Sequence, residues 1–410
     1  MAYKNFGAPG NIYYGIGSLE SLTTISASRV LIVTDPGVRK VGLVDRVEKI
    51  LRTNNTSVAT FDQVEADPSK ETVWSIFALA RDFKPDLFIG LGGGSSIDAG
   101  KASWVLYEHP EFAELPFLEF LKQASSCTLR KKAHYVAIPT TSGTASEVTR
   151  VAIVTDRSTT PPFKGAIGTY QIVPDIAILD PELPATMPPE VTANTGYDAL
   201  VHAIECYVVI PPMDMIDPLA LWAAKTIMQW LPKAVDNGKD MEAREKMHIA
   251  SLQAGLAFSN GGLGLVHSGA HQLGAQFHIA HGRTVAYMIC PVLASWYPFR
   301  KSRLVSLAES LGINGKDDAT KVTKLLDKLD ELKKTVGIPL SIQESGLKKS
   351  EFQQHVDEIS KAYFDQMYRS NPATKKLTPE ELRASFKPGT VEELVGIFWQ
   401  AWDGRRAIIK

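Results

Sequence analysis

The chain has 410 residues but only three cysteines, Cys127, Cys206 and Cys290, which lie far apart. No pair has C-x-x-C spacing, so we expect neither a disulfide framework nor a cysteine-built zinc site. A surplus of either charge is also missing, because 44 basic residues stand against 45 acidic residues. The balance gives no electrostatic reason to expect binding to nucleic acid or to an acidic membrane.

Long apolar runs are absent as well. The opening residues MAYKNFGAPG contain no apolar signal region. The longest apolar stretch, residues 285–296, is interrupted by Pro291 and is too short to span a bilayer. We therefore expect a cytoplasmic protein. Its length and its 44% content of hydrophobic residues suffice for one large or two ordinary cores.

The two commonest phosphate-loop fingerprints, G-x-G-x-x-G and a loop ending in G-K-[ST], are missing from the glycine-rich segment PDLFIGLGGGSSIDAGKASWVL. This segment instead predicts a buried strand over residues 86–91, a triple glycine, and a helix that begins at Ser95. Asp98 stands at capping-box spacing from Ser95. Backbone N–H groups and the helix dipole would form an anion site there, suited to a pyrophosphate. A tight turn without a ligand is the alternative.

A second loop, IPTTSGTASEVT, repeats this arrangement after the expected strand HYVAIP. Thr144 and Glu147 again have capping-box spacing. The loop is rich in hydroxyl groups that can bond to phosphate or ribose, carried by Thr140, Thr141, Ser142 and Thr144. Two such loops in one chain favour a dinucleotide ligand.

Acidic and imidazole side chains gather in the second half. Asp198 and His202 are four residues apart, so on a helix they share one face. Nine histidines serve the whole chain, yet four of them fall in one glycine-rich stretch: His267, His271, His278 and His281. One carboxylate with three imidazoles suits zinc or ferrous iron better than calcium or magnesium. A hydrogen-bonded structural pair is the alternative for Asp198 and His202 alone.

The organisation of the chain changes near residue 185. Before it, short β-rich runs alternate with helical stretches, at residues 30–34, 87–91, 135–138 and 176–179. After a proline-rich hinge, long amphipathic helical patterns follow, at residues 218–231, 240–258 and 317–335. We predict an α/β dinucleotide-binding domain with a parallel sheet over residues 1–185 and an all-helical metal- and substrate-binding domain over residues 186–410. The active site is expected in the cleft between them.

In this order the motifs YYGIGSLESL, VLIVTDPGV, GLGGGSSIDAGK, IPTTSGTASEVTR, GYDALVHAIECYV and GLVHSGAHQLGAQFHIAHG resemble the iron-containing, or group III, alcohol dehydrogenase family. The resemblance covers nearly the whole chain and fades toward the C-terminus. It implies a Rossmann-like domain followed by a helical metal-binding domain, in the dehydroquinate synthase-like superfamily. It also implies a homodimer or a larger homo-oligomer.

Carried over residue by residue, the resemblance implies four metal ligands: Asp198, His202, His267 and His281. It implies these cofactor contacts: Gly92, Gly93, Gly94, Ser95, Asp98, Thr140, Thr141, Thr144 and Lys164. Lys164 would approach the cofactor ribose. His271 matches a histidine beside the metal, and we expect it to relay a proton to solvent. A packing role is the alternative for His271.

Asp35 bears on the choice of cofactor. It ends the expected strand RVLIVTD, where a carboxylate accepts hydrogen bonds from ribose hydroxyls and repels a 2′-phosphate. This favours NAD over NADP, with helix capping as the alternative role for Asp35. The expected metal is Fe²⁺ or Zn²⁺, with Mn²⁺ as a further candidate, acting as Lewis acid and template.

The implied activity is an NAD(H)-linked alcohol dehydrogenase or aldehyde reductase for a small primary alcohol or aldehyde. If Arg150 or Arg283 faced the site, an anionic tail would fit, as in sulfoacetaldehyde/isethionate or succinic semialdehyde/4-hydroxybutyrate. A diol, as with lactaldehyde or 1,3-propanediol, is the other option. Two rival functions are a lyase of the dehydroquinate synthase type and a non-catalytic nucleotide- or metal-binding protein.

Overall fold

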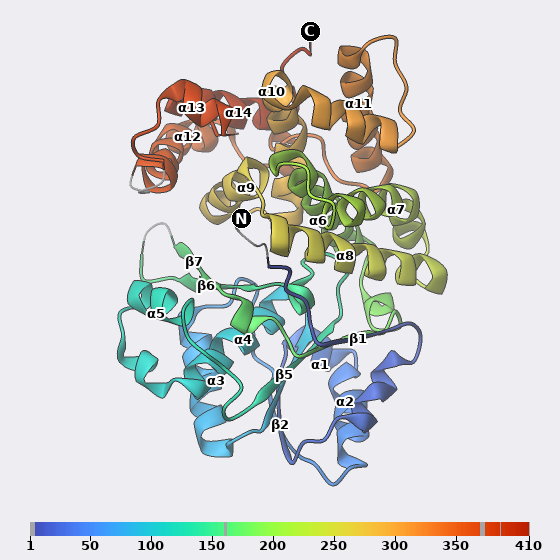
Figure 1. The fold of residues 1–410 in the computed structure, drawn as a ribbon, viewed down its shortest axis with the longest axis vertical. Coiled ribbons are helices and arrows are strands. Elements are labelled where there is room, and N and C mark those ends of the chain that lie inside the picture. Colours follow the sequence, from blue (N-terminus) through green and yellow to red (C-terminus); the bar gives the residue numbers. More distant parts are fainter. Residues whose placement is uncertain (1–4, 160–161, 370–373, 386, 410) are drawn as a thin grey trace. The chain divides into compact units, whose positions relative to one another are not determined.

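The computed structural model describes residues 5–159, 162–369, 374–385 and 387–409 (Figure 1). The chain divides into two compact units. Unit 1 comprises Met1–Thr192 with Asn237–Asn260, and unit 2 comprises Ala193–Asp236 with Gly261–Lys410. The division at residue 192 lies close to the boundary expected at residue 185. Residues 237–260 differ from the expectation, because they belong to the unit that contains the sheet.

Unit 1 is built on a six-stranded sheet in the order β1-β8-β5-β4-β2-β3, and each neighbouring pair is parallel. The strands are β1 (Asn11–Tyr14), β2 (Arg29–Val33), β3 (Ser57–Phe61), β4 (Leu87–Gly92), β5 (His134–Pro139) and β8 (Ile176–Leu179). This confirms the predicted parallel-sheet fold. Two further strands that the sequence pattern did not indicate, β6 (Val151–Asp156) and β7 (Phe163–Gly168), form a separate antiparallel pair.

Strand β2 shows why both faces of the sheet are covered. Alternate residues of a strand point to opposite faces. Leu31 and Val33 belong to one buried cluster, while Val30 and Ile32 belong to another. The first cluster is completed by helices α3 (Lys70–Phe83), α4 (Gly94–Glu108) and α5 (Phe117–Ala124), and the second by α2 (Leu43–Arg52) and a short helix at Ser18–Thr24.

The strand order reverses between β2 and β4. From β2 the chain passes through α1 (Pro36–Lys40) and α2 to β3 on one side, and from β4 through α4 and α5 to β5 on the other. In open parallel sheets, ligands bind at such a switch point, beyond the carboxyl ends of the strands. Asp35 lies in the loop after β2 and Gly93 directly follows β4, so these two expected cofactor residues lie at this position.

Helix α8 (Met241–Gly261) explains why residues 237–260 join the sheet unit. Leu252 belongs to a buried cluster with Ala145, Val148 and Leu179. A Cβ on Gly255 would lie 2.3 Å from the Cβ of Ala145. The small side chains of α8 therefore allow the helix to pack tightly against the loop that follows β5.

In the described part of unit 2 every regular element is helical, as predicted. The elements are α6 (Pro189–Val209, from Ala193 onward), α7 (Asp217–Asp236), α9 (Leu265–Phe277), α10 (His281–Ser310), α11 (Asp318–Thr335), α12 (Lys349–Phe364), α13 (Pro379–Ala384), α14 (Val391–Asp403) and two short turns of helix. Helix α6 starts at Pro189, a residue type preorganised for the first helical position. No single described helix is long and apolar enough to cross a membrane. The bent pair α8 and α9 has the length and composition of a membrane span when the two helices are taken together.

Candidate metal centre and nucleotide-binding loops

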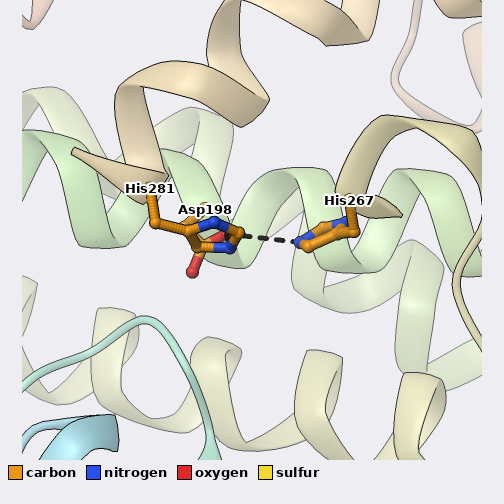
Figure 2. Close-up of side chains that lie close together, drawn as sticks. All are labelled: Asp198, His267 and His281. Carbon is orange, nitrogen blue, oxygen red and sulfur yellow. Dashed lines mark hydrogen bonds and ion pairs between the residues drawn. The ribbon is translucent and has the colours of Figure 1, made fainter. Parts of the chain in front are cut away.

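The candidate metal centre surrounds one oxygen of Asp198. Nε2 of His267 lies 3.3 Å from Oδ1 of Asp198, Nε2 of His281 lies 3.6 Å from it, and Nε2 of His202 lies 3.9 Å from it. Asp198, His267 and His281 offer ligand atoms that all lie within 4.8 Å of one another (Figure 2). His202 lies outside this tighter group, but its ring stacks on that of His267 with centroids 4.3 Å apart.

Local structure accounts for this arrangement. Asp198 and His202 lie one turn apart on α6, while His267 is the third residue of α9 and His281 is the first residue of α10. Two donors that each lie about 2.1 Å from one cation at tetrahedral angles are separated by about 3.4 Å. The separations between Asp198 and the three histidines are of this size, so the donor set fits a divalent cation.

The electrostatics of the centre also fit a cation. Burial would raise the pKa of Asp198, yet His202, His281 and His267 hold that pKa well below its usual range. Burial opposes protonation of His267, but its hydrogen bonds to Asp198 and Glu205 raise its pKa to about 9. Positive charge is therefore favoured at this position, and a metal ion supplies it when the imidazoles are neutral.

Glu205 is a residue of this centre that the sequence reasoning missed. It is fully buried on α6, and its Oε2 lies 2.6 Å from Nδ1 of His267. The spacing from Asp198 to His202 to Glu205 is four and then three residues, which places all three on one helix face. That spacing was the available signal.

Of the two other histidines in this stretch, His271 lies near the candidate ligands and His278 ends α9. The ring of His271 stands 4.9 Å from that of His281, centroid to centroid, so His271 lies beside the candidate metal centre. His278 is exposed and ends α9 in the left-handed conformation. Its position at the helix end gives it a local backbone role.

The triple-glycine loop has no side chains that would keep a ligand away from its backbone N–H groups. Gly93 precedes α4 as its N-cap and supplies no side-chain cap, and the first turn of α4 contains no acidic residue. Side chains of the threonine loop lie against the glycines: a Cβ on Gly94 would lie 2.8 Å from Cγ2 of Thr144, and one on Gly93 would lie 3.4 Å from Cγ2 of Thr141. The uncapped helix N-terminus next to hydroxyl groups fits a pyrophosphate.

The two expected capping boxes are wrong. Helix α4 begins at Gly94 without a side-chain cap, so Ser95 and Asp98 do not form a box. Oδ2 of Asp98 instead accepts a hydrogen bond from the backbone N–H of Ile153 at 2.9 Å, which directs Asp98 toward β6. After β5, the short helix Ser146–Val148 has Ala145 as its N-cap, so Thr144 and Glu147 form no box either.

Asp98 belongs to a buried charged group with Lys101 and Glu147. Burial raises the pKa of Asp98 to about 6 and that of Glu147 to about 7, and it lowers the pKa of Lys101 to about 8. Lys101 donates hydrogen bonds to the backbone carbonyls of Thr149 and Val151 at 2.8 and 3.1 Å. The contacts of Asp98 favour a structural role in holding α4 to β6.

The remaining cofactor candidates lie around the glycine loop. Oδ1 of Asp35 accepts hydrogen bonds from the N–H groups of Gly37 and Val38, so it caps α1, and its Oδ2 lies 3.1 Å from the hydroxyl of Ser96. The N–H of Thr140 donates to the carbonyl of Gly92 at 2.9 Å. Asp35 thus combines the capping role with a position at the switch point.

Lys164 and Ser95 are linked through a residue that the sequence reasoning did not single out. Nζ of Lys164 lies 2.8 Å from Oδ1 of Asp67, and the N–H of Asp67 donates to the hydroxyl of Ser95 at 3.3 Å. Arg150, which was considered for an anionic substrate tail, lies with its guanidinium 5.0 Å from the centroid of the Tyr170 ring.

A parallel sheet with these loops and a helical unit with this cluster are the arrangement expected of a metal- and dinucleotide-dependent dehydrogenase. Comparison with known families agrees: the model for iron-containing alcohol dehydrogenase matches residues 9–181, and the model for the C-terminal part of the Fe-containing alcohol dehydrogenase family matches residues 192–386. The chain therefore belongs to the iron-containing alcohol dehydrogenase family and is an enzyme of the alcohol dehydrogenase class.

Among curated relatives, the chain is 40% identical to an NADPH-dependent butanol dehydrogenase of Clostridium saccharobutylicum, over 93% of this chain and 97% of that protein. It is 39% identical to a bifunctional aldehyde-alcohol dehydrogenase of Escherichia coli, but spans only 44% of that longer protein. Among solved structures, an alcohol dehydrogenase from Oenococcus oeni is 27% identical with a TM-score of 0.84, covering 98% of this chain and all of the other.

Proposed function

We propose that the protein is a metal-dependent, NAD(H)-linked enzyme that interconverts a small neutral primary alcohol and its aldehyde. The observation that carries the proposal is the convergence of Nε2 of His202, His267 and His281 on Oδ1 of Asp198, at 3.3 to 3.9 Å. We assign these four residues as the metal ligands. Within the family, Fe²⁺ is the first candidate, and the same donors suit Zn²⁺ or Mn²⁺.

A bound divalent cation supplies Lewis acidity toward an alcohol or carbonyl oxygen, and a bound nicotinamide accepts or returns the hydride. The chain supplies charge balance for this chemistry. The buried carboxylates of Asp198 and Glu205 carry two negative charges, which match a divalent cation when the imidazoles are neutral. Because the two carboxylates and the cation then have a net charge of zero, no uncompensated charge is buried.

Alcohol oxidation transfers a hydride to NAD⁺ and releases one proton, so a path to solvent is required. We assign that path to His271, whose ring lies 4.9 Å from the ring of His281. An imidazole exchanges protons near neutral pH. The variant His271→Ala should turn over more slowly while its metal content stays unchanged. A loss of metal would make His271 a ligand instead.

The preference for NAD(H) rests on Asp35, which lies in the loop after β2 and contacts Ser96 beside the glycine loop. Its carboxylate would repel the 2′-phosphate of NADP. The relative from Clostridium saccharobutylicum is named as NADPH-dependent, so cofactor preference is a direct test of this residue.

The contact of Arg150 supports the choice of a neutral substrate. Its guanidinium lies over the Tyr170 ring, so a packing contact within unit 1 accounts for Arg150 without an anionic ligand. An unbranched neutral alcohol agrees with the butanol named for one relative. An anionic aldehyde such as sulfoacetaldehyde or succinic semialdehyde should be reduced less efficiently than butanal.

The experiment is the oxidation of NADH and NADPH by chelator-stripped protein, reconstituted separately with Fe²⁺, Zn²⁺ or Mn²⁺. The aldehydes are butanal, 3-hydroxypropionaldehyde, lactaldehyde, succinic semialdehyde and sulfoacetaldehyde. We expect metal-dependent loss of NADH, fastest with a neutral aldehyde. Equal turnover without metal would refute the proposed chemistry, and a preference for an anionic aldehyde would refute the substrate assignment.

A further inference from the structure

The buried carboxylate of Glu205 makes three hydrogen bonds to the beginning of α9. Oε1 accepts from the N–H of Val266 at 2.6 Å. Oε2 accepts from the N–H of His267 at 3.2 Å and lies 2.6 Å from Nδ1 of the same histidine. Glu205 is fully buried, so these groups replace the water that would otherwise solvate its charge.

We propose that Glu205 is a positioning residue that holds the proton of neutral His267 on Nδ1, so that Nε2 is the nitrogen left to bind the cation beside Asp198. A carboxylate only accepts hydrogen bonds, so Nδ1 of His267 must be the donor in their 2.6 Å contact. In a neutral imidazole the other nitrogen, Nε2, then carries the lone pair. That nitrogen lies 3.3 Å from Oδ1 of Asp198, on the side of the candidate ligands.

Glu205 also replaces a missing helix cap. Gly264 is the N-cap of α9 and has no side chain to cap the helix, while Val266 and His267 are its second and third residues. Their N–H groups are the ones that an N-cap side chain usually satisfies. Glu205 satisfies both from α6, and its negative charge is favourable at a helix N-terminus.

Gly264 is suited to this arrangement because of the space that it leaves. A Cβ at this position would lie 3.1 Å from Oε1 of Glu205 and 2.9 Å from Cγ2 of Val209. A side chain there would displace the carboxylate from the N–H groups. Gly264 at the start of α9 and Glu205 on α6 therefore act together: they fix the start of the helix and the orientation of the His267 ring.

The inference rests on the proposed metal centre, and metal affinity tests it without turnover. In Glu205→Gln, the amide of nearly equal size must place its NH₂ group either against Nδ1–H of His267 or against the N–H of Val266. One donor then faces another, or the proton of His267 moves to Nε2. We expect the dissociation constant for Zn²⁺, measured by competition with a chromophoric chelator, to rise by about 10–100-fold.

The matched control is Asp180→Asn, because Asp180 is another fully buried carboxylate that accepts hydrogen bonds from backbone N–H groups, those of Leu19 and Glu182. Its Zn²⁺ affinity should equal that of the wild type. The NAD dissociation constant of Glu205→Gln should also be unchanged. Equal Zn²⁺ affinity in Glu205→Gln and wild type would refute the role of Glu205. A wild type that binds no Zn²⁺ would instead refute the proposed metal centre.

If Glu205→Gln does not fold, the wild type itself provides the test. In the Zn²⁺-loaded protein labelled with ¹⁵N-histidine, one resonance absent from His267→Ala should show a protonated Nδ1 and a metal-bound Nε2. A metal-bound Nδ1, or an Nδ1 without a proton, would overturn the proposal.

Discussion

Nδ1 of His248 lies 2.9 Å from the hydroxyl oxygen of Ser142, and both side chains are buried. Ser142 belongs to the threonine loop that packs against the glycine loop, whereas His248 lies on α8. This hydrogen bond joins two segments 106 residues apart in the sequence. It explains how a helix outside the βαβ connections supports a loop assigned to cofactor binding.

Removal of either partner should weaken cofactor binding. His248→Ala and Ser142→Ala each leave a buried polar group without its partner, which costs about 1–3 kcal/mol. Part of this cost should appear as a several-fold higher NAD dissociation constant, measured by calorimetry. Because both changes break one bond, the double variant should resemble the single variants. Additive effects would contradict the coupling.

Stability should depend on pH through His248. Burial, helped by the nearby Arg244, lowers the pKa of His248 from 6.5 to about 3. Between these values the unfolded chain binds a proton that the folded chain does not, so folding loses stability as pH falls below 6.5. The slope from this group approaches about 1.4 kcal/mol per pH unit.

The variant His248→Gln removes this titration and keeps a polar side chain near Ser142. Its melting temperature should therefore fall less than that of the wild type as pH is lowered from about 6.5 to about 4. Parallel curves for the two proteins would show that His248 is not buried in its neutral form.

Gly94→Ala should impair the cofactor site. The new Cβ would lie 2.8 Å from Cγ2 of Thr144, so the glycine and threonine loops must separate. We expect the NAD dissociation constant to rise at least about tenfold, equivalent to about 1.4 kcal/mol, with metal content unchanged. Gly168→Ala is the control, because a Cβ there meets no atom within 4 Å. Equal NAD affinity in the two variants would contradict the loop assignment.

Asp35→Ser should relax the choice of cofactor without unfolding α1. Serine can replace aspartate as an N-cap, but it lacks the charge that would repel a 2′-phosphate. The ratio of kcat/KM for NADPH to that for NADH should increase by about tenfold or more, or about 1.4 kcal/mol. Asp317→Ser is the matched control, since Asp317 caps α11 through the N–H of Thr320. A ratio that stays constant in Asp35→Ser would leave Asp35 with capping alone.

Hydrophobic pattern and turn residues were sufficient to predict the parallel sheet and the later helices. They missed β1 and β3, which are short and only partly buried, and the β6–β7 pair, because short apolar runs do not distinguish a strand from part of a helix. Periodicity also identified α8 as a helix, but it does not say which core a helix joins.

For the candidate site, too, local sequence pattern predicted some residues and missed those whose roles depend on distant contacts. Residue type and helical spacing indicated Asp198 and His202. The clustering of histidines indicated the stretch from His267 to His281, and the family resemblance selected His267 and His281 within it. Glu205 and His248 were missed because their roles depend on hydrogen bonds between residues 62 and 106 positions apart. The capping boxes failed for a related reason: Asp98 finds a backbone partner on β6, which competes with the local cap.

The most direct test of the account is the metal content of His267→Ala, measured beside the wild type and beside His134→Ala, whose side chain is largely exposed. After reconstitution with Fe²⁺ and gel filtration, wild type and His134→Ala should retain about one metal ion per chain. The variant His267→Ala should retain almost none, with NAD affinity unchanged and turnover lost. Full metal content and full activity in His267→Ala would contradict the proposed metal centre.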